Sequence, residues 1–209
     1  MRRLEDKITG VIAYVLPLLA SFPPMLGWAG LMTLPFIFFL TSILVRFAEL
    51  PSSLGYLLLG GSALDVGASV LGLALLALSV VYMRSRKSSG LVISGPYRFV
   101  RHPQYLGLIL FTASMTSRSV WMLTHTFGVG WLSLEQTVFL WYAMSVSYAI
   151  IAGVEELQLS KKFPDDWPGY REATGFMLPA VSTKNRAIET LILLVCFGLL
   201  LSVMIAVNP

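Results

Sequence analysis

Residues 136–154 read QTVFLWYAMSVSYAIIAGV and contain no charged side chain. A run of nineteen such residues is close to the roughly 20 that a membrane-spanning helix needs. Residues 66–83 and 190–207 form two further uncharged runs of this length. Residues 8–45 also carry no charge and are long enough for two helices, interrupted near Pro17 or Pro23–Pro24. We therefore predict an all-α, polytopic integral membrane helical bundle with five to six transmembrane helices.

The composition supports this class, because only 12% of the 209 residues are charged and the mean hydropathy is +0.76. A soluble domain carries about 25% charged residues. The expected helices cover residues 8–22, 26–47, 63–83, 103–118, 135–154 and 187–207. We expect residues 120–134 to form an interfacial loop, with Arg118 at the membrane boundary and His125 as an interfacial side chain. The single cysteine, Cys196, excludes an intramolecular disulfide and a cysteine-based metal site.

The positive net charge of +4 follows from two polar segments between the apolar runs. Ten of the fifteen lysines and arginines lie in residues 84–101 and 161–186. Short basic loops remain on the cytosolic side of a membrane protein, and they also attract anionic headgroups. We therefore predict a multi-pass protein with both segments in the cytosol and a lipid bilayer, not nucleic acid, as its partner. No obligate protein partner is evident.

Three regions follow from this pattern. Residues 1–84 carry N-terminal transmembrane helices, residues 85–180 form a core with the two polar segments and two transmembrane helices, and residues 181–209 hold a C-terminal transmembrane helix.

The first polar segment, LVISGPYRFVRHPQYLG at residues 91–107, combines turn signals with a helix start. Gly95-Pro96 favours a turn, and Pro103 suits the first turn of a helix. His102 then lies at the helix entrance, where an anion or an electron-rich ligand edge is favoured. Gly107 allows close approach of a ligand or a neighbouring helix. A basic loop that anchors aromatic residues at the interface is the simpler interpretation; it accounts for Arg98 alone but not for Arg101, His102 and Tyr105 together.

The second polar segment begins with Glu155-Glu156, directly after the uncharged run of residues 136–154. On a continuous helix Glu156 shares a face with Leu159 and Phe163. A carboxylate on an apolar face is suited to a ligand's hydroxyl or ammonium group. The alternative is a pair that ends the helix at the membrane surface, with Lys161 and Lys162 as partners one turn later.

Together the two segments resemble the isoprenylcysteine carboxyl methyltransferase family, whose wider relatives include phospholipid N-methyltransferases. The resemblance covers residues 89–179 and rests on Gly-x-Tyr and Arg-His-Pro-x-Tyr, followed about fifty residues later by Glu-Glu-x-x-Leu-x-x-x-Phe. It implies an S-adenosylmethionine-dependent enzyme without a Rossmann sheet or a metal site. Its acceptor would be a lipophilic small molecule or a prenylated group.

The resemblance also assigns roles to individual residues. Tyr97, His102 and Tyr105 correspond to cofactor-binding positions, as do Leu91 and Val92 through their backbone. Glu156 or Glu155 corresponds to the carboxylate that binds the cofactor. Glu155 also corresponds to a residue suspected of a catalytic role, and it would act as the base for an amine acceptor. These assignments are the candidate cofactor-binding and catalytic site.

Three features depart from the family pattern. Pro164 replaces a glycine, Phe176 replaces an arginine near the end of the motif, and a further apolar helix follows Pro179. Arg171 or Arg101 would then orient a carboxylate acceptor, so we include Arg101 as a catalytic candidate and Arg171 as a substrate-binding candidate.

Two other functions remain open. Sterol reductases share a related C-terminal region and use NADPH, but a Gly-Asp commonly follows their tyrosine, whereas Gly107 precedes Leu108 here. A non-catalytic transporter or regulator is the third possibility. Against it, no charged residue is expected inside a span away from the ends of the two motifs.

Overall fold

The computed structural model describes residues 24–47, 51–86, 90–125, 132–179, 181–183 and 185–208. In this part of the chain the elements are seven α-helices and one short 3-10 helix. They are α2 (Pro24–Phe47), α3 (Pro51–Leu59), α4 (Ala63–Arg86), η2 (Gly95–Arg98), α5 (Pro103–His125), α6 (Leu134–Lys162), α7 (Trp167–Ala173) and α8 (Arg186–Val207). The helix expected at residues 8–22 lies outside the described residues.

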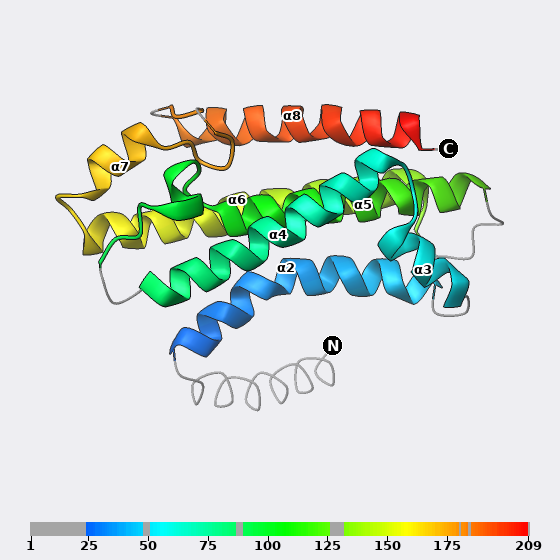
Figure 1. Ribbon diagram of the computed structural model, residues 1–209, viewed down its shortest axis with the longest axis horizontal. Coiled ribbons are helices and arrows are strands. Elements are labelled where there is room, and N and C mark those ends of the chain that lie inside the picture. Colours follow the sequence, from blue (N-terminus) through cyan, green and yellow to red (C-terminus); the bar gives the residue numbers. More distant parts are fainter. Residues whose placement is uncertain are drawn as a thin grey trace, which may run out of the picture.

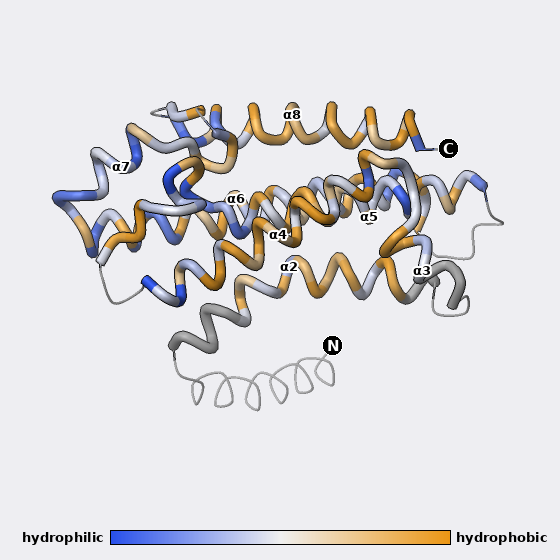
Figure 2. The backbone as a smooth tube through the Cα atoms, viewed as in Figure 1, coloured by the Kyte–Doolittle hydropathy of each residue, from blue (hydrophilic) through white to orange (hydrophobic). Residues whose placement is uncertain are grey.

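Four helices, α4, α5, α6 and α8, are long and apolar enough to cross a membrane. Helix α2 adds a shorter apolar stretch between Gly30 and Leu44. The tube in Figure 2 is mostly hydrophobic along α4, α8 and the coloured part of α2, and hydrophilic segments lie around α7 and the adjoining helix ends. The predicted class, an all-α membrane helical bundle, is therefore confirmed.

Helix α5 is the central element of the bundle and contacts α3, α4, α6 and α8. It is also the most buried of the four long helices. The start of α5, the end of α6 and the start of α8 lie at the same end of the molecule, together with η2 and α7 (Figure 1). The two polar segments of the sequence are thereby brought to one end of the bundle.

Helices α4 and α5 approach each other closely at two glycines. A Cβ atom on Gly72 would lie 2.7 Å from the carbonyl oxygen of Gly107, and one on Gly107 would lie 2.6 Å from the oxygen of Gly72. Small residues permit this backbone approach between helices in a bilayer. The hydroxyls of Ser69 and Ser114 form a hydrogen bond of 2.5 Å across the same interface. Of the two partners expected for Gly107, the structure shows the neighbouring helix.

Helix α5 is longer than predicted and continues past Arg118 to His125. The Arg118 side chain is fully buried and donates to the carbonyl oxygens of Leu57, Leu58 and Gly60 at the end of α3. The carbonyls of Leu57 and Leu58 belong to the last turn of α3, where the helix itself provides no donor, and the guanidinium donates to them instead. The expected loop at residues 120–134 is therefore wrong over its first six residues. His125 is the last residue of α5 and is exposed.

Helix α6 also continues past its predicted end, from residue 154 to Lys162. It begins with a capping box, in which Ser133 accepts from the N–H of Gln136 and the Gln136 side chain accepts from the N–H of Ser133. The eight added residues include Glu155 and Glu156. Both carboxylates therefore project from a continuous helix.

Candidate functional site

The two polar segments are joined first by their backbones. Val100 and Gly175 form an isolated parallel bridge, and the N–H of Arg101 donates to the Gly175 oxygen at 2.8 Å. The N–H of His102 donates to the oxygen of Phe176 at 3.3 Å. A Cβ atom on Gly175 would lie 1.9 Å from the Leu178 oxygen, so only glycine fits this position. Residues more than seventy positions apart are thus held in fixed register.

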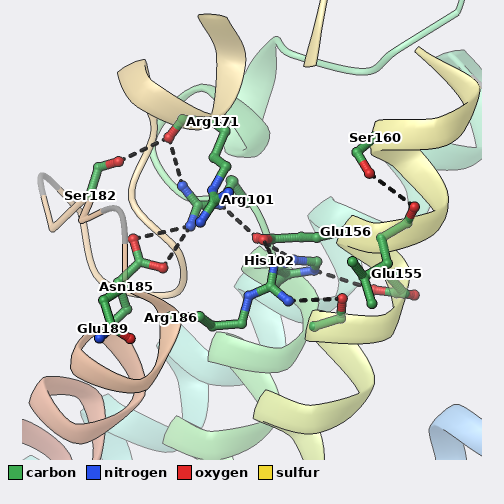
Figure 3. A network of polar contacts seen from close by, with 12 residues as sticks. Arg101, His102, Glu155, Glu156, Ser160, Arg171, Ser182, Asn185, Arg186 and Glu189 are labelled. Carbon is green, nitrogen blue, oxygen red and sulfur yellow. Dashed lines mark hydrogen bonds and ion pairs between the residues drawn. The ribbon is translucent and has the colours of Figure 1, made fainter. Parts of the chain in front are cut away.

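Arg101 is buried among acceptors from three elements (Figure 3). Its Nε donates to Oε1 of Glu156 at 2.7 Å, and its Nη2 lies 3.0 Å from Oε2 of Glu189. Its Nη1 donates to the backbone oxygens of Arg171, at 2.8 Å, and Thr174. The planar guanidinium is well suited to several acceptors at once. All three of its nitrogens thus contact protein oxygens.

Glu156 is the matching acceptor and is 1% exposed. Oε1 accepts from Arg101 and lies 3.2 Å from Nε2 of His102, while Oε2 pairs with Nη2 of Arg186. Arg186 also donates to the oxygen of Gly153 at 3.1 Å. Both oxygens of this carboxylate are therefore engaged with cationic or hydrogen-bonding side chains.

His102 lies between two carboxylates. Its Nδ1 is 3.2 Å from Oε2 of Glu155, and its Nε2 is 3.2 Å from Oε1 of Glu156. Burial lowers the pKa of His102, but the hydrogen bonds and charges of Glu155 and Glu156 outweigh burial and raise its pKa above the ordinary value. A protonated imidazole has a donor on each ring nitrogen, which matches this arrangement.

Tyr105 holds the second carboxylate. Its hydroxyl donates to Oε1 of Glu155 at 3.1 Å, and its ring stacks on Tyr148 with centroids 5.0 Å apart. The His102 ring packs on Tyr105 and meets the edge of Phe176 at 5.4 Å. Phe176, which occupies the place of an expected arginine, therefore helps to fix the imidazole.

A cavity of about 590 Å³ opens beside these groups. Its polar and charged lining consists of Tyr97, Arg101, His102, Gln104, Glu155, Gln158, Lys162 and Tyr170. Its larger apolar lining includes Met32, Met83, Leu91, Val92, Leu159, Phe163 and Trp167. A second cavity of about 590 Å³ shares Leu91, Phe163 and Tyr170 with the first and adds the charged side chains of Arg98 and Asp166.

Tyr97 and Tyr170 lie in the wall of the first cavity and form hydrogen bonds that fix it. The Tyr170 hydroxyl donates to the backbone oxygen of Tyr97 at 2.8 Å, and the Tyr97 hydroxyl donates to Oε1 of Gln104 at 3.2 Å. Burial raises the pKa of both phenols, and the nearby Glu155 carboxylate raises that of Tyr97 further. Both therefore remain neutral hydrogen-bonding groups at pH 7.

Six of the nine residues predicted for the site line this cavity: Leu91, Val92, Tyr97, Arg101, His102 and Glu155. Tyr105 supports Glu155, and Glu156 lies in the ion network and not on the wall. The Arg171 side chain lines neither cavity, and its backbone oxygen accepts from Arg101. Of the two adjacent carboxylates, Glu155 is thus the one at the cavity.

Sequence reasoning missed two members of the network, Arg186 and Glu189 in the first turn of α8. Glu189 is 2% exposed, pairs with Arg101 and accepts from the N–H of Thr183 at 2.8 Å. The available signal was a lone carboxylate directly before the uncharged run of residues 190–207. Such a charge at the start of an apolar helix also suits the helix dipole, so the pattern had an ordinary explanation.

The arrangement combines an apolar chamber with a carboxylate and a small set of hydrogen-bonding groups. Small-molecule pockets commonly have a volume of about 300–1,000 Å³, with mostly apolar walls and few polar groups. The cavity meets both criteria. Comparison of the chain with family models, with curated proteins and with solved structures found no match.

Proposed function

We propose that this protein is a multi-pass membrane methyltransferase that uses S-adenosylmethionine and acts on a lipophilic acceptor, with its site facing the cytosol. The observation that carries the proposal is the convergence of the two motif segments at one cavity. Leu91, Val92, Tyr97, Arg101 and His102 come from the first segment, and Glu155 comes from the second.

The residues at the cavity match the chemistry of the cofactor. S-adenosylmethionine carries a sulfonium, an ammonium and a carboxylate, and it supplies an electrophilic methyl group when bound. Glu155 offers a negative charge for its cationic groups, and Lys162 offers a positive charge for its carboxylate. Tyr97 and Gln104 offer neutral hydrogen bonds, and the aromatic and aliphatic walls exclude water.

In this proposal the main contribution of the protein is to hold the methyl donor and the acceptor in position. Methyl transfer from a sulfonium is an in-line displacement, which depends on holding donor and acceptor in line. His102 and Tyr105 fix both oxygens of Glu155, so its carboxylate has one orientation toward the cavity. Arg101 and Glu156 act behind it as positioning residues, because their polar atoms contact the protein.

The first candidate acceptor is an isoprenylcysteine-like carboxylate, which follows from the family resemblance. A carboxylate is already nucleophilic at pH 7 and needs a cation to orient it. Lys162 lines the cavity and supplies one such charge, which the acceptor would share with the carboxylate of the cofactor. The apolar walls suit a hydrophobic tail, which gains about 0.8 kcal/mol for each buried CH₂ group.

A second candidate, a phospholipid amine, is favoured by a specific observation. Glu155 reaches the cavity, whereas the guanidinium of Arg101 is occupied by Glu156, Glu189 and backbone oxygens. An amine must lose a proton before it accepts a methyl group, and a carboxylate is a suitable general base. In this alternative Glu155 would act as the general base.

The experiment is methyl transfer by the purified full chain in lipid nanodiscs, with radiolabelled S-adenosylmethionine. Three acceptors are compared: a farnesylated cysteine analogue, its tail-less counterpart and phosphatidylethanolamine. Transfer to the farnesylated compound and not to the tail-less one is the expected result. Transfer to phosphatidylethanolamine alone would select the second candidate, and transfer to none of the three would contradict the lipophilic acceptor.

A further inference from the structure

The first turn of α8 contributes two charged side chains to the network behind the cavity. Four of the groups, Arg101, Arg186, Glu156 and Glu189, comprise two cations and two anions. Arg101, Glu156 and Glu189 are each no more than 3% exposed. A buried ion without a partner costs several kcal/mol, so these charges depend on one another.

Glu189 occupies Nη2 of Arg101, and Arg186 occupies Oε2 of Glu156. Without Glu189, Arg101 retains one carboxylate partner, Glu156, which it shares with His102 and Arg186. The other carboxylate of the network is Glu155, which directly precedes Glu156 in α6 and shares His102 with it. An attraction between Arg101 and Glu155 would then compete with the orientation that His102 and Tyr105 impose.

We propose that α8 belongs to the functional site and that Glu189 and Arg186 are positioning residues. Glu189 occupies the guanidinium of Arg101, and Arg186 occupies the carboxylate of Glu156. Because these groups are already paired, Glu155 remains directed at the cavity. This inference rests on the proposed function. It assigns a role to α8, the helix that follows the two motif segments. The contacts that carry this role join Arg101 to Glu189, 88 residues apart, and Glu156 to Arg186, 30 residues apart.

A glycine on α6 provides an independent test of the same geometry. A Cβ atom on Gly153 would lie 3.1 Å from Nη1 and 3.5 Å from Cδ of Arg186. Gly153→Ala therefore displaces the Arg186 guanidinium without removing any charge. Alanine is also a better helix former than glycine, so the change does not weaken α6 itself.

The test measures S-adenosylhomocysteine binding to the full chain in nanodiscs by calorimetry, which gives both a Kd and a number of sites per chain. We expect Glu189→Gln and Arg186→Gln to raise the Kd about tenfold and Gly153→Ala to raise it about threefold. Arg186→Lys, which keeps the charge, should remain within about twofold of wild type. The exposed Glu172→Gln should leave the Kd unchanged.

The outcomes distinguish the positioning role of α8 from the proposed methyltransferase function. A purely structural role for α8 would reduce the number of sites per chain while the Kd of the folded fraction stayed the same, and this result would overturn the inference. Unchanged Kd in both Glu189→Gln and Gly153→Ala would also overturn it. Wild-type protein that binds no S-adenosylhomocysteine would instead overturn the proposed function, and the inference with it.

Discussion

Tyr105, in the first turn of α5, donates to Oε1 of Glu155 on α6 at 3.1 Å, across fifty residues of chain. The same carboxylate lies 3.2 Å from Nδ1 of His102, so both of its oxygens are held. The next residue, Glu156, contacts Arg101 and Arg186 instead. Adjacent residues on a helix face directions about 100° apart, and here they divide into one carboxylate at the cavity and one in the ion network.

Because Glu155 lies at the cavity and Glu156 lies in the ion network, we expect Glu155→Gln and Glu156→Gln to have different effects. Glu156→Gln removes the anion shared by Arg101, His102 and Arg186, and breaking a buried ion network costs about 3–5 kcal/mol. We expect a large fall in the midpoint of thermal unfolding in detergent. Glu155→Gln weakens the contacts with His102 and Tyr105 but leaves the contacts between Arg101 and its carboxylates in place, so its midpoint should fall less, and it should lose binding of S-adenosylhomocysteine. Equal midpoints for the two variants would contradict the division.

His102 predicts a pH dependence of stability. Its pKa is raised in the folded state by Glu155 and Glu156. A raised pKa means that the folded state binds the proton more tightly, so the stabilisation is complete below the ordinary pKa of about 6.5 and is lost as pH rises through the folded value. The unfolding midpoint of wild type should therefore fall as pH increases from about 6.5 upward. His102→Gln should show a flatter profile over this range, and parallel profiles would be the opposing result.

The glycine contact between α4 and α5 predicts a matched pair of substitutions. Gly72→Ala places a methyl group 2.7 Å from backbone atoms of Gly107 and Phe111, which cannot move independently of α5. We expect a destabilisation of about 1–3 kcal/mol from overpacking. Gly67 lies on the same helix with nothing within 4 Å of its Cβ position, so Gly67→Ala should be neutral or stabilising. Thermal unfolding of both variants, measured in detergent, checks the contact.

The proposed orientation can be tested by thiol labelling. With Cys196 replaced, cysteines at the exposed positions Ser85 and Ser182 should resist a membrane-impermeant reagent in intact cells. Thr124, exposed near the opposite end of α5, should label when it is changed to cysteine. Labelling at Ser85 or Ser182 would put the cavity end of the bundle outside the cytosol.

The sequence predicts the long apolar helices well, because uncharged runs in a bilayer have few alternatives to a helix. It predicts their ends less well where a charge is buried. We predict helix ends at Arg118 and before Glu155-Glu156, but the partners of these residues come from α3, α5 and α8, which lie far away in the chain. The role of Glu189 is not predicted for the same reason, since no neighbouring residue in the sequence indicates that it contacts Arg101.

The motif residues were easier to predict than their individual roles. The spacing brings Arg101, His102 and Tyr105 to the start of one helix and Glu155-Glu156 to the end of another. The rotation of α6 against α5 and α8 decides which of the two carboxylates faces the cavity. This rotation cannot be predicted from Glu155-Glu156, because the two adjacent glutamates are chemically identical. The sequence predicts that Arg171 or Arg101 orients a substrate, and in the structure the Arg101 guanidinium contacts protein oxygens.

The most direct test of the central claim is calorimetric titration of the wild-type chain in nanodiscs with S-adenosylhomocysteine, alongside Glu155→Gln and a parallel titration with NADPH. We predict saturable binding of S-adenosylhomocysteine at one site per chain and a loss of about tenfold or more in affinity for Glu155→Gln, which is about 1.4 kcal/mol per tenfold change. NADPH should give no signal. Binding of NADPH without binding of S-adenosylhomocysteine would contradict the claim and favour a reductase.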